Sequence, residues 1–354
     1  MTIDAQTPPR PVRLPPRSLI FWLLGAVGGA LVFTTLVMLA TGAPPLETYR
    51  LVLLGAFSSP TRLADATMLA APLLLCAAGL TLTFGAGLYN LGIEGQMTLG
   101  AVFAMLVLRL LPDAPPPLLW ALAFAAGALG GALWAALAGA LRLYARVSEI
   151  FAGLGLNFLA TGVALYLVFG PWKRAGTASM SGTEPLPQEL WLPTLERLRL
   201  APAAPVIAVA GLLLVWFALR RTGWGLEVRA TGLNPAAAER LGVPAARRLL
   251  EALGACGALA GLAGTIQVLA VFHALIPNIS SGIGLIGLLV ALLVRANPTW
   301  VLPVSVAFAC FTVGSIQLPL ALGTDSSISG VLQGALVLFA LAASGLGARG
   351  RASG

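Results

Sequence analysis

The sequence is poor in charged residues and in the side chains on which most catalytic sites depend. Only 10% of its 354 residues are Asp, Glu, Lys or Arg, and it contains one histidine, His273, and one lysine, Lys173. Its three cysteines, Cys76, Cys256 and Cys310, lie far apart in apolar segments and form no CxxC pair. These shortages argue against a disulfide framework and against a His/Cys metal cluster. The cysteines are interpreted as small buried apolar residues.

Three motifs of nucleotide-binding, metal-dependent and acyl-transfer enzymes are also missing. The chain has no GxxxxGK[ST] phosphate-binding loop, no HExxH metal helix and no GxSxG nucleophile elbow. A P-loop supplies the backbone N–H groups and the lysine that hold nucleotide phosphates, so this chain is not a P-loop ATPase by itself. With a single histidine, a membrane enzyme is a poor interpretation. An intramembrane enzyme or a scaffold without transport stays open as an alternative.

Long apolar runs dominate the sequence instead. Hydrophobic residues make up 58% of the chain, and its mean hydropathy is +0.92. A helix needs about 20 mainly apolar residues to cross about 30 Å of hydrocarbon, and lipid requires each spanning element to satisfy its own backbone groups. Because the runs are continuous and rich in Ala, Leu and Gly, they predict an all-α polytopic membrane protein. The ten predicted spans are 19–41, 67–87, 95–111, 118–142, 148–170, 204–220, 249–275, 282–295, 299–318 and 327–345.

The distribution of Lys and Arg predicts the orientation of these spans. With the N-terminus in the cytoplasm, 14 of the 21 basic residues fall on the cytoplasmic side and seven fall outside. This excess follows the positive-inside rule and places both termini in the cytoplasm. The basic residues sit at the ends of apolar runs, without the interleaved aromatics of a nucleic-acid site. The formal charge of +8 is therefore attributed to topology, and no nucleic-acid partner is expected.

The predicted organisation is a cytoplasmic tail over 1–18, a transmembrane domain over 19–345 and a second cytoplasmic tail over 346–354. Within the domain, the outer loop 171–203 contains five prolines and is expected to have little regular structure. The uncharged run 18–43 is too long for the apolar core of a signal peptide and is interpreted as the first span.

The inner loop 221–248 carries signals for a short helix. Asn234 is a favourable N-cap, Pro235 suits the first helical position, and Gly242 stands where a glycine commonly ends a helix. These three residues predict a cytoplasmic helix of about two turns over 235–241.

Glycines recur at the four-residue spacing that lets helices approach closely. Gly127 and Gly131 form one such pair, and Gly257 and Gly261 form another, with Gly264 beyond it. Such spacing puts small residues on one face of a helix, where they admit a neighbouring backbone. Tight helix packing is a sufficient explanation for them.

Several polar side chains are predicted to lie at membrane depth. Glu94 is the sharpest case, because an ionisable group in a bilayer is costly unless it faces a cavity or a partner. Two explanations stay open for it. One is a place on a solute path, and the other is the first turn of the helix over 95–111, where the macrodipole stabilises a carboxylate. The other polar residues at this depth are Asn90, Gln96, Asn157, Gln267, Asn297, Gln317 and Gln333.

The neighbours of Glu94 favour a functional role. Asn90 and Gln96 are placed to hydrogen-bond either Glu94 or the backbone that Gly92 and Gly95 free from a regular helix. A glycine-broken helix buried in protein is how transporters present backbone groups to a pathway.

Three other polar residues have simpler explanations. For Asn157 and Gln333, a hydrogen bond between two helices is slightly favoured over a role in transport. For His273, a polar group at the outer end of a span is favoured. The candidate residues of the substrate pathway are Asn90, Glu94, Gln96 and Asn157.

The segment GLYNLGIEGQMTLGA, residues 87–101, resembles a signature of bacterial ABC-transporter permeases for nucleosides and simple sugars. These are the importers associated with basic-membrane-protein-type lipoproteins, within the broader ribose/branched-chain amino acid permease group. RATGLNPAAAERLGVP at 229–244, followed by GALAGLAG at 257–264, is similar to the cytoplasmic coupling segment of the same family. SEIFAGLGLNFLATG at 148–162 and SGIGLIGLLVALLVRANP at 281–298 look like family blocks, although the first begins with Ser where Asn is frequent.

The resemblance covers most of the chain from about residue 66 to residue 345 and implies one half of a transmembrane pore. In this family two permeases, often non-identical, assemble with cytoplasmic ATP-binding-cassette ATPase subunits and an external substrate-binding lipoprotein. ATP and Mg²⁺ would then bind the partner ATPase, and this chain would need no cofactor or metal of its own. The implied location is the bacterial inner membrane, in contact with lipid.

The same resemblance implies that the inner loop contacts the ATPase. The candidate coupling residues are Arg229, Gly232, Asn234, Pro235, Glu239 and Gly242. The implied function is inward transport of a nucleoside or a related small polar solute, simple sugars included, without an ATPase site in the chain. The main alternative is an ion-coupled secondary transporter in which Glu94 carries a proton.

Overall fold

Helices account for the regular structure throughout the described part of the chain. The computed structural model describes residues 16–174, 182–195, 197–323, 327–328, 330–335, 337–339 and 342. Its α-helices are α1 (Pro16–Ala40), α2 (Pro45–Leu54), α3 (Pro60–Gly85), α4 (Ile93–Leu110), α5 (Pro116–Tyr144), α6 (Glu149–Phe169), α7 (Ala203–Arg221), α8 (Gly223–Leu233), α9 (Pro235–Arg240), α10 (Ala245–Ile266), α11 (Ile283–Leu293), α12 (Val301–Ser315) and α13 (Leu318–Leu322). The helix α10 continues into the π-helical segment η3 (Gln267–Phe272). The predicted tails 1–18 and 346–354 lie outside the described residues, except for the first turn of α1.

The all-α polytopic fold predicted from the sequence is confirmed. Seven helices in the described residues are long and apolar enough to cross a membrane. Three shorter apolar helices, Val27–Ala40, Ile283–Leu293 and Gly330–Phe339, coincide with the other three predicted spans. The count of ten spans and the cytoplasmic placement of the termini stay predictions.

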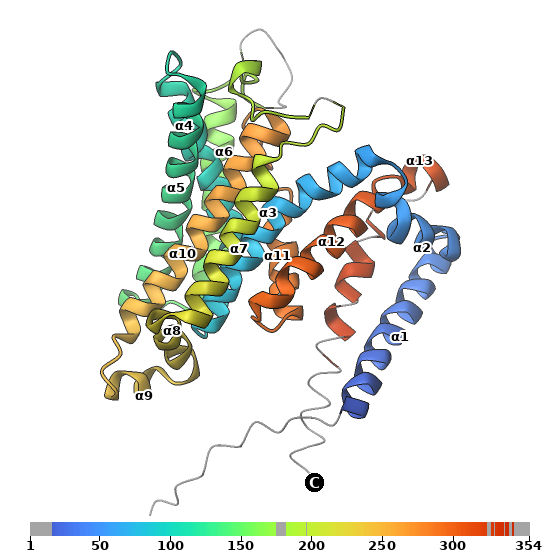
Figure 1. The fold of residues 1–354 in the computed structure, drawn as a ribbon, viewed down its shortest axis with the longest axis horizontal. Helices are drawn as coiled ribbons and strands as arrows, with labels where there is room; N and C mark the ends of the chain where they lie inside the picture. The colour runs from blue at the N-terminus through green and yellow to red at the C-terminus, as the bar shows by residue number, and fades with distance from the viewer. Residues whose placement is uncertain are drawn as a thin grey trace, which may run out of the picture.

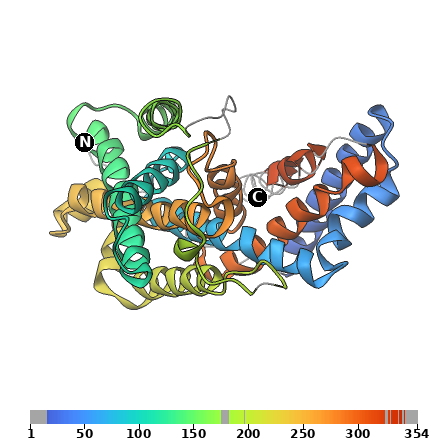
Figure 2. The same cartoon turned by 90° about the horizontal axis from the view of Figure 1, so that it is seen from above.

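The helices form a bundle and a smaller outlying group (Figures 1 and 2). The bundle contains α3 to α8, α10 and α11, and the outlying group contains α1, α2, α12 and α13. The helix α3 joins the two, because it packs against α7, α10 and α11 on one side and against α12 on the other. We call the end of the bundle that carries α8 and α9 the inner end, following the charge count, and the opposite end the outer end.

Burial distinguishes central helices from peripheral ones. In α3, 83% of the residues in an apolar 18-residue stretch are buried inside the protein. The corresponding share is 67% for α4 and for α10 together with η3. The corresponding values for α5, α6 and α7 are 28–33%. Large apolar side chains, including Phe151 and Phe158 of α6, therefore remain exposed on the periphery, as a bilayer permits. The central helices are the ones that position a site inside the protein.

Glycine contacts hold α10 against α4 and α5, as the four-residue spacing predicted. A Cβ built on Gly261 would lie 1.9 Å from the carbonyl oxygen of Gly127, and one on Gly131 would lie 2.1 Å from that of Gly257. On the α4 side, a Cβ on Gly264 would lie 2.1 Å from the Met97 carbonyl oxygen. Only glycine lets these backbones approach so closely, so the three helices form one tightly packed unit.

Among the described residues, three short helices were not predicted from the sequence: α2, α8 and α13. The helix α2 starts at a Pro–Pro pair between the first two spans. The helix α8 contains three glycines, but Thr222 caps it, because its hydroxyl accepts the Gly225 N–H at 3.1 Å. In the predicted outer loop, the described residues contain one short 3₁₀ turn, Gln188–Leu190, and two isolated β-bridges.

Candidate functional site

Gly87 turns the chain back into the protein at the end of α3. Its φ is +76°, and the Leu88 N–H donates to the Thr83 carbonyl at 2.8 Å, which closes the helix in the Schellman manner. A Cβ on Gly87 would lie 2.9 Å from the Gly232 carbonyl oxygen of α8, so a side chain is excluded there. The next residues, 88–92, therefore run from the contact with α8 into the core before α4 begins.

Asn90 and Gln96 form a closed pair of amides in that core. Each side chain donates to the carbonyl oxygen of the other at 3.0 Å, and Asn90 also accepts the Gly92 N–H at 3.1 Å. The Asn90 amide further approaches Cys256 Sγ on α10 at 3.2 Å. Both amides are buried, and buried amides are costly unless they are paired in this way. The pair fixes the shape of residues 90–96.

Asn157 of α6 completes the first turn of α4. Gly92 occupies the N-cap position of α4 and has no side chain with which to accept a backbone N–H. Asn157 Oδ1 accepts the Gly95 N–H at 2.8 Å instead, and its Nδ2 donates to the Leu91 carbonyl at 2.8 Å. This is the hydrogen bond between helices that the sequence favoured for Asn157. An N-terminal N–H that its own helix leaves free is thus capped from a neighbouring helix.

Glu94 caps the N-terminus of α11 in the same way. The N-cap of α11 is Gly282, again without a side chain, and Glu94 Oε1 accepts the Leu285 N–H at 2.8 Å. Glu94 also lies in the first turn of its own helix α4. Its carboxylate therefore meets the positive ends of two helix dipoles. The capping explanation offered by the sequence fits this geometry, but the helix capped by the side chain is a distant one.

A cavity of about 670 Å³ opens toward the outer end, between α3, η3 and α12. We call it the α3–α12 cavity. Its apolar lining includes Met68 and Leu69 of α3 and Phe272 of η3. Its polar lining includes Arg62, Asp65, Arg199, Gln267, Thr312 and Gln317. The volume lies within the range of about 300–1,000 Å³ that is usual for small-molecule sites.

The π-helical segment shapes one wall of this cavity. Gln267 is 3% exposed, and its Nε2 lies 3.5 Å from the Ile279 carbonyl oxygen. At the other end of the segment, His273 has a φ of +53° and stacks on Trp191 with ring centroids 3.7 Å apart. Leu192, next to Trp191, donates its N–H to the Leu269 carbonyl at 3.1 Å. Single π-helical turns are frequent at functional sites, because they free backbone groups and redirect side chains.

The inner loop folds as two short helices rather than one. In α9, Asn234 Oδ1 accepts the Ala237 N–H at 3.1 Å, and Pro235 takes the first helical position. Gly242, at a φ of +85°, ends the helix, and the Val243 N–H donates a hydrogen bond to the Ala238 carbonyl at 3.0 Å. The predicted helix 235–241 thus corresponds to α9 within one residue.

The other candidate coupling residues lie mostly at the surface. Glu239 is exposed on α9, and Arg229, which is also exposed, donates to the Gly225 carbonyl at 3.2 Å within α8. Gly232 lies against the end of α3, where its Cβ would be 2.2 Å from the Gly85 carbonyl oxygen. The inner loop is therefore in direct contact with the start of the 87–96 segment.

Comparison with known proteins decides the family. The model of the family described as "Branched-chain amino acid transport system / permease component" matches residues 62–341. The chain belongs to this family. Among curated proteins it is 25% identical to the guanosine ABC transporter permease protein NupP of Bacillus subtilis, over 91% of each chain. It is 26% identical to the nucleoside ABC transporter permease protein NupB of Lactococcus lactis, over 86% of this chain and 84% of that one.

A third relative is named for a sugar. The glucose ABC transporter permease protein TsgB13 of Haloferax volcanii is 28% identical, over 96% of this chain and 91% of the relative. The chain is thus a transport subunit, the permease of an ABC transporter, and a multi-pass integral membrane protein, which in bacteria lies in the inner membrane.

In this permease, the predicted pathway residues and the cavity are separate. Asn90, Glu94, Gln96 and Asn157 are absent from the described lining of the α3–α12 cavity and connect helices instead. The sequence had marked Gln267 and Gln317 as polar at membrane depth without selecting them. Arg62, Asp65 and Trp191 were missed, because the second span was predicted to start at residue 67 and the outer loop to have little structure.

Proposed function

We propose that this permease is one of two such subunits in an importer that moves a nucleoside or a related small polar solute inward. A simple sugar is the second solute class. ATP is hydrolysed on a separate ATPase subunit, which binds ATP and Mg²⁺, and this chain has no ATPase site and no cofactor of its own. The names of the relatives support the solute class, because two of them refer to guanosine or nucleosides and one to glucose.

The α3–α12 cavity is the observation that carries the proposal. Its charged groups include two cations, Arg62 and Arg199, and one carboxylate, Asp65, so Asp65 offsets one of the two positive charges. Amide and hydroxyl groups from Gln267, Thr312 and neighbouring residues stand among apolar side chains. An uncharged solute with an apolar ring face and several hydroxyls matches such a lining, and a nucleoside has both features.

The inner loop supports the proposal that an ATPase subunit docks there. Leu233, the last residue of α8, and Leu241, the C-cap residue of α9, are 89% and 82% exposed on either side of the capped helix α9. Exposed apolar side chains on an ordered surface helix are typical of a site for a protein partner. The partners proposed are this ATPase, a second permease that is a paralogue or another copy of the chain, and an external substrate-binding lipoprotein.

The geometry of Glu94 speaks against the secondary-transporter alternative. A proton carrier must reach the solute path, but Glu94 uses Oε1 to hold the Leu285 N–H and lies outside the described cavity lining. A role in holding α11 explains the residue without proton coupling.

Gln267 tests whether solute passes through the cavity. We expect Gln267→Leu to raise the KM for guanosine uptake about tenfold, because one polar contact worth about 1.4 kcal/mol is lost while the side-chain volume is nearly kept. Uptake of radiolabelled guanosine, with glucose as competitor, would be measured in cells that express the whole transporter.

The matched control is Gln188→Leu, which makes the same substitution at an exposed glutamine outside the cavity lining. It should leave uptake unchanged. An unaltered KM in Gln267→Leu would remove the cavity from the solute path. Uptake of glucose in preference to guanosine would replace the nucleoside with the sugar.

A further inference from the structure

The helix α10 and its π-helical extension join the inner loop to the α3–α12 cavity as one element. Together they span 28 residues, Ala245–Phe272, or roughly 40 Å at 1.5 Å per residue. The inner end of α10 follows α9 after a four-residue connection (Figure 1). At the outer end, the π-helical extension supplies the cavity wall that begins at Gln267. A displacement of the inner loop therefore has a direct mechanical route to the cavity, provided that the loop is firmly attached to α10.

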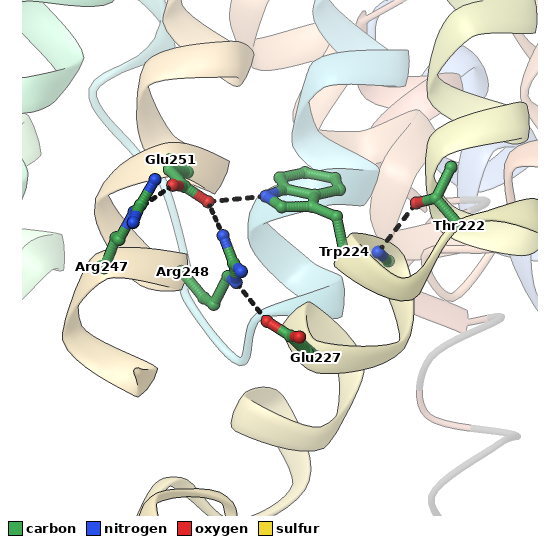
Figure 3. A network of polar contacts seen from close by, with 7 residues as sticks. Thr222, Trp224, Glu227, Arg247, Arg248 and Glu251 are labelled. Carbon is green, nitrogen blue, oxygen red and sulfur yellow. Dashed lines mark hydrogen bonds and ion pairs between the residues drawn. The ribbon is translucent and has the colours of Figure 1, made fainter. Parts of the chain in front are cut away.

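A charged network makes that attachment (Figure 3). Arg248 of α10 donates from Nε to Glu227 of α8 at 2.5 Å and from Nη1 to Glu251 of α10 at 2.6 Å. Trp224 of α8 donates its indole N–H to the same Glu251 oxygen at 2.7 Å. Two residues of α8, three positions apart and thus on one face, are in this way joined to the first two turns of α10.

Arg248 is the centre of the network, and Arg247 beside it is not. The Arg248 side chain is 17% exposed and bridges carboxylates on two different helices. The Arg247 side chain is 73% exposed and, within the part of the chain that the structure describes, pairs only with Glu251 on its own helix. A partly buried guanidinium that serves two carboxylates through its planar fork contributes more than an exposed pair within one helix.

The route beyond the network is stiff. Gly257, Gly261 and Gly264 seat α10 against α5 and α4 at backbone contact, so α10 has little freedom to bend away from a push at its base. Glu94, in the first turn of the same α4, caps α11. Motion of α10 thus reaches both the cavity wall and the helix α11, whose residues Ile283 and Ile286 also line the cavity.

We propose that Arg248, with Glu227 and Glu251, is the joint through which movement of α8 and α9 is transmitted to α10 and so to the cavity. Arg248 is a positioning residue, because it acts through α10 and is not part of the described lining of the cavity. The inference rests on the proposed function, in which an ATPase subunit pushes on the inner loop. It predicts that loss of the joint separates ATP hydrolysis from transport.

The test uses the complete transporter with its ATPase in proteoliposomes. We expect Arg248→Gln to lower the solute moved per ATP hydrolysed about tenfold, as the loss of a partly buried charge bridge permits, while ATPase recovery and hydrolysis stay within about twofold. Arg247→Gln is the matched control and should keep the wild-type ratio. A role in stability alone would reduce uptake and hydrolysis together and would leave their ratio unchanged.

A second variant guards against a folding defect. Glu227→Gln removes the carboxylate on α8 and leaves the Arg248–Glu251 pair intact, so α10 keeps its own contacts. Glu227→Gln should also lower the amount of solute moved per ATP hydrolysed. The proposed role of Arg248 would be refuted if either variant, Arg248→Gln or Glu227→Gln, moved as much solute per ATP hydrolysed as the wild type. A parallel loss of hydrolysis and uptake would refute it as well. Failure of the wild-type protein to recover any ATPase would overturn the proposed function instead.

Discussion

Replacing Glu94 by Ala is expected to reduce uptake about tenfold or more, while Gln in its place should cause a smaller loss of about threefold. The Leu285 N–H, near the start of α11, has Glu94 Oε1 as its acceptor at 2.8 Å. A hydrogen bond to a charged group contributes about 1.5–3 kcal/mol, and less where water competes for it, so its removal loosens the start of α11. Gln keeps an acceptor oxygen and loses only the charge, which at helix N-termini is worth about 0.3–1 kcal/mol for each helix.

The measurement is initial-rate uptake at equal amounts of assembled complex in the membrane. Glu47, an exposed first-turn residue of α2, is the control, because it meets only its own helix dipole. Glu47→Ala should leave uptake within about twofold of the wild-type rate. Equal losses in the Ala and Gln variants of Glu94 would show that the charge matters and the cap does not. Normal uptake in both variants would show that transport does not need the contact between Glu94 and α11.

Replacing Gly261 by Ala is expected to prevent the permease from folding. The added Cβ would lie 1.9 Å from the Gly127 carbonyl oxygen, well inside van der Waals contact, and the obstacle is backbone that no rotamer change can move. The helices α4, α5 and α10 would have to separate, and overpacking of a well-packed core costs about 1–3 kcal/mol and sometimes more. We therefore expect little of the variant to elute as a monodisperse species from gel filtration in detergent.

Gly254 on the same helix is the matched control. A Cβ there meets nothing within 4 Å, so Gly254→Ala removes a helix-destabilising glycine without a clash. It should raise the unfolding temperature, because Ala is favoured over Gly in a helix by about 1 kcal/mol. A folded Gly261→Ala variant with wild-type thermal stability would show that the glycine contacts do not hold α10.

The long elements of this fold were predictable, because lipid imposes one requirement on all of them. Each of the seven long apolar helices in the described residues overlaps a predicted span. The predicted bounds were wrong where charged residues lie inside a helix. The second span was predicted to start at residue 67, because Arg62 and Asp65 interrupt its apolar run. The structure begins α3 at Pro60, where the Ser59 hydroxyl caps the Arg62 N–H at 3.3 Å.

The candidate site was only partly predictable, for a related reason. The sequence indicated that Asn90, Glu94 and Gln96 belong together, and it raised capping as one role for Glu94. It did not indicate that the capped helix would be α11, almost 200 residues further along the chain. Capping between two distant helices produces no characteristic residue spacing in the sequence. The cavity was hidden for the same reason, since its wall combines α3, η3 and α12. The π-helical turn that begins at Gln267 also has no signature in the sequence.

The central claim is that ATP on a partner subunit, and not an ion gradient, drives solute through this permease. The most direct measurement is guanosine uptake by proteoliposomes that contain the full transporter, with ATP held constant while an uncoupler collapses the proton gradient. We predict that uptake continues at the original rate and stops when ATP is withdrawn. Loss of uptake on collapse of the gradient, with ATP still present, would contradict this account and return Glu94 to the role of proton carrier.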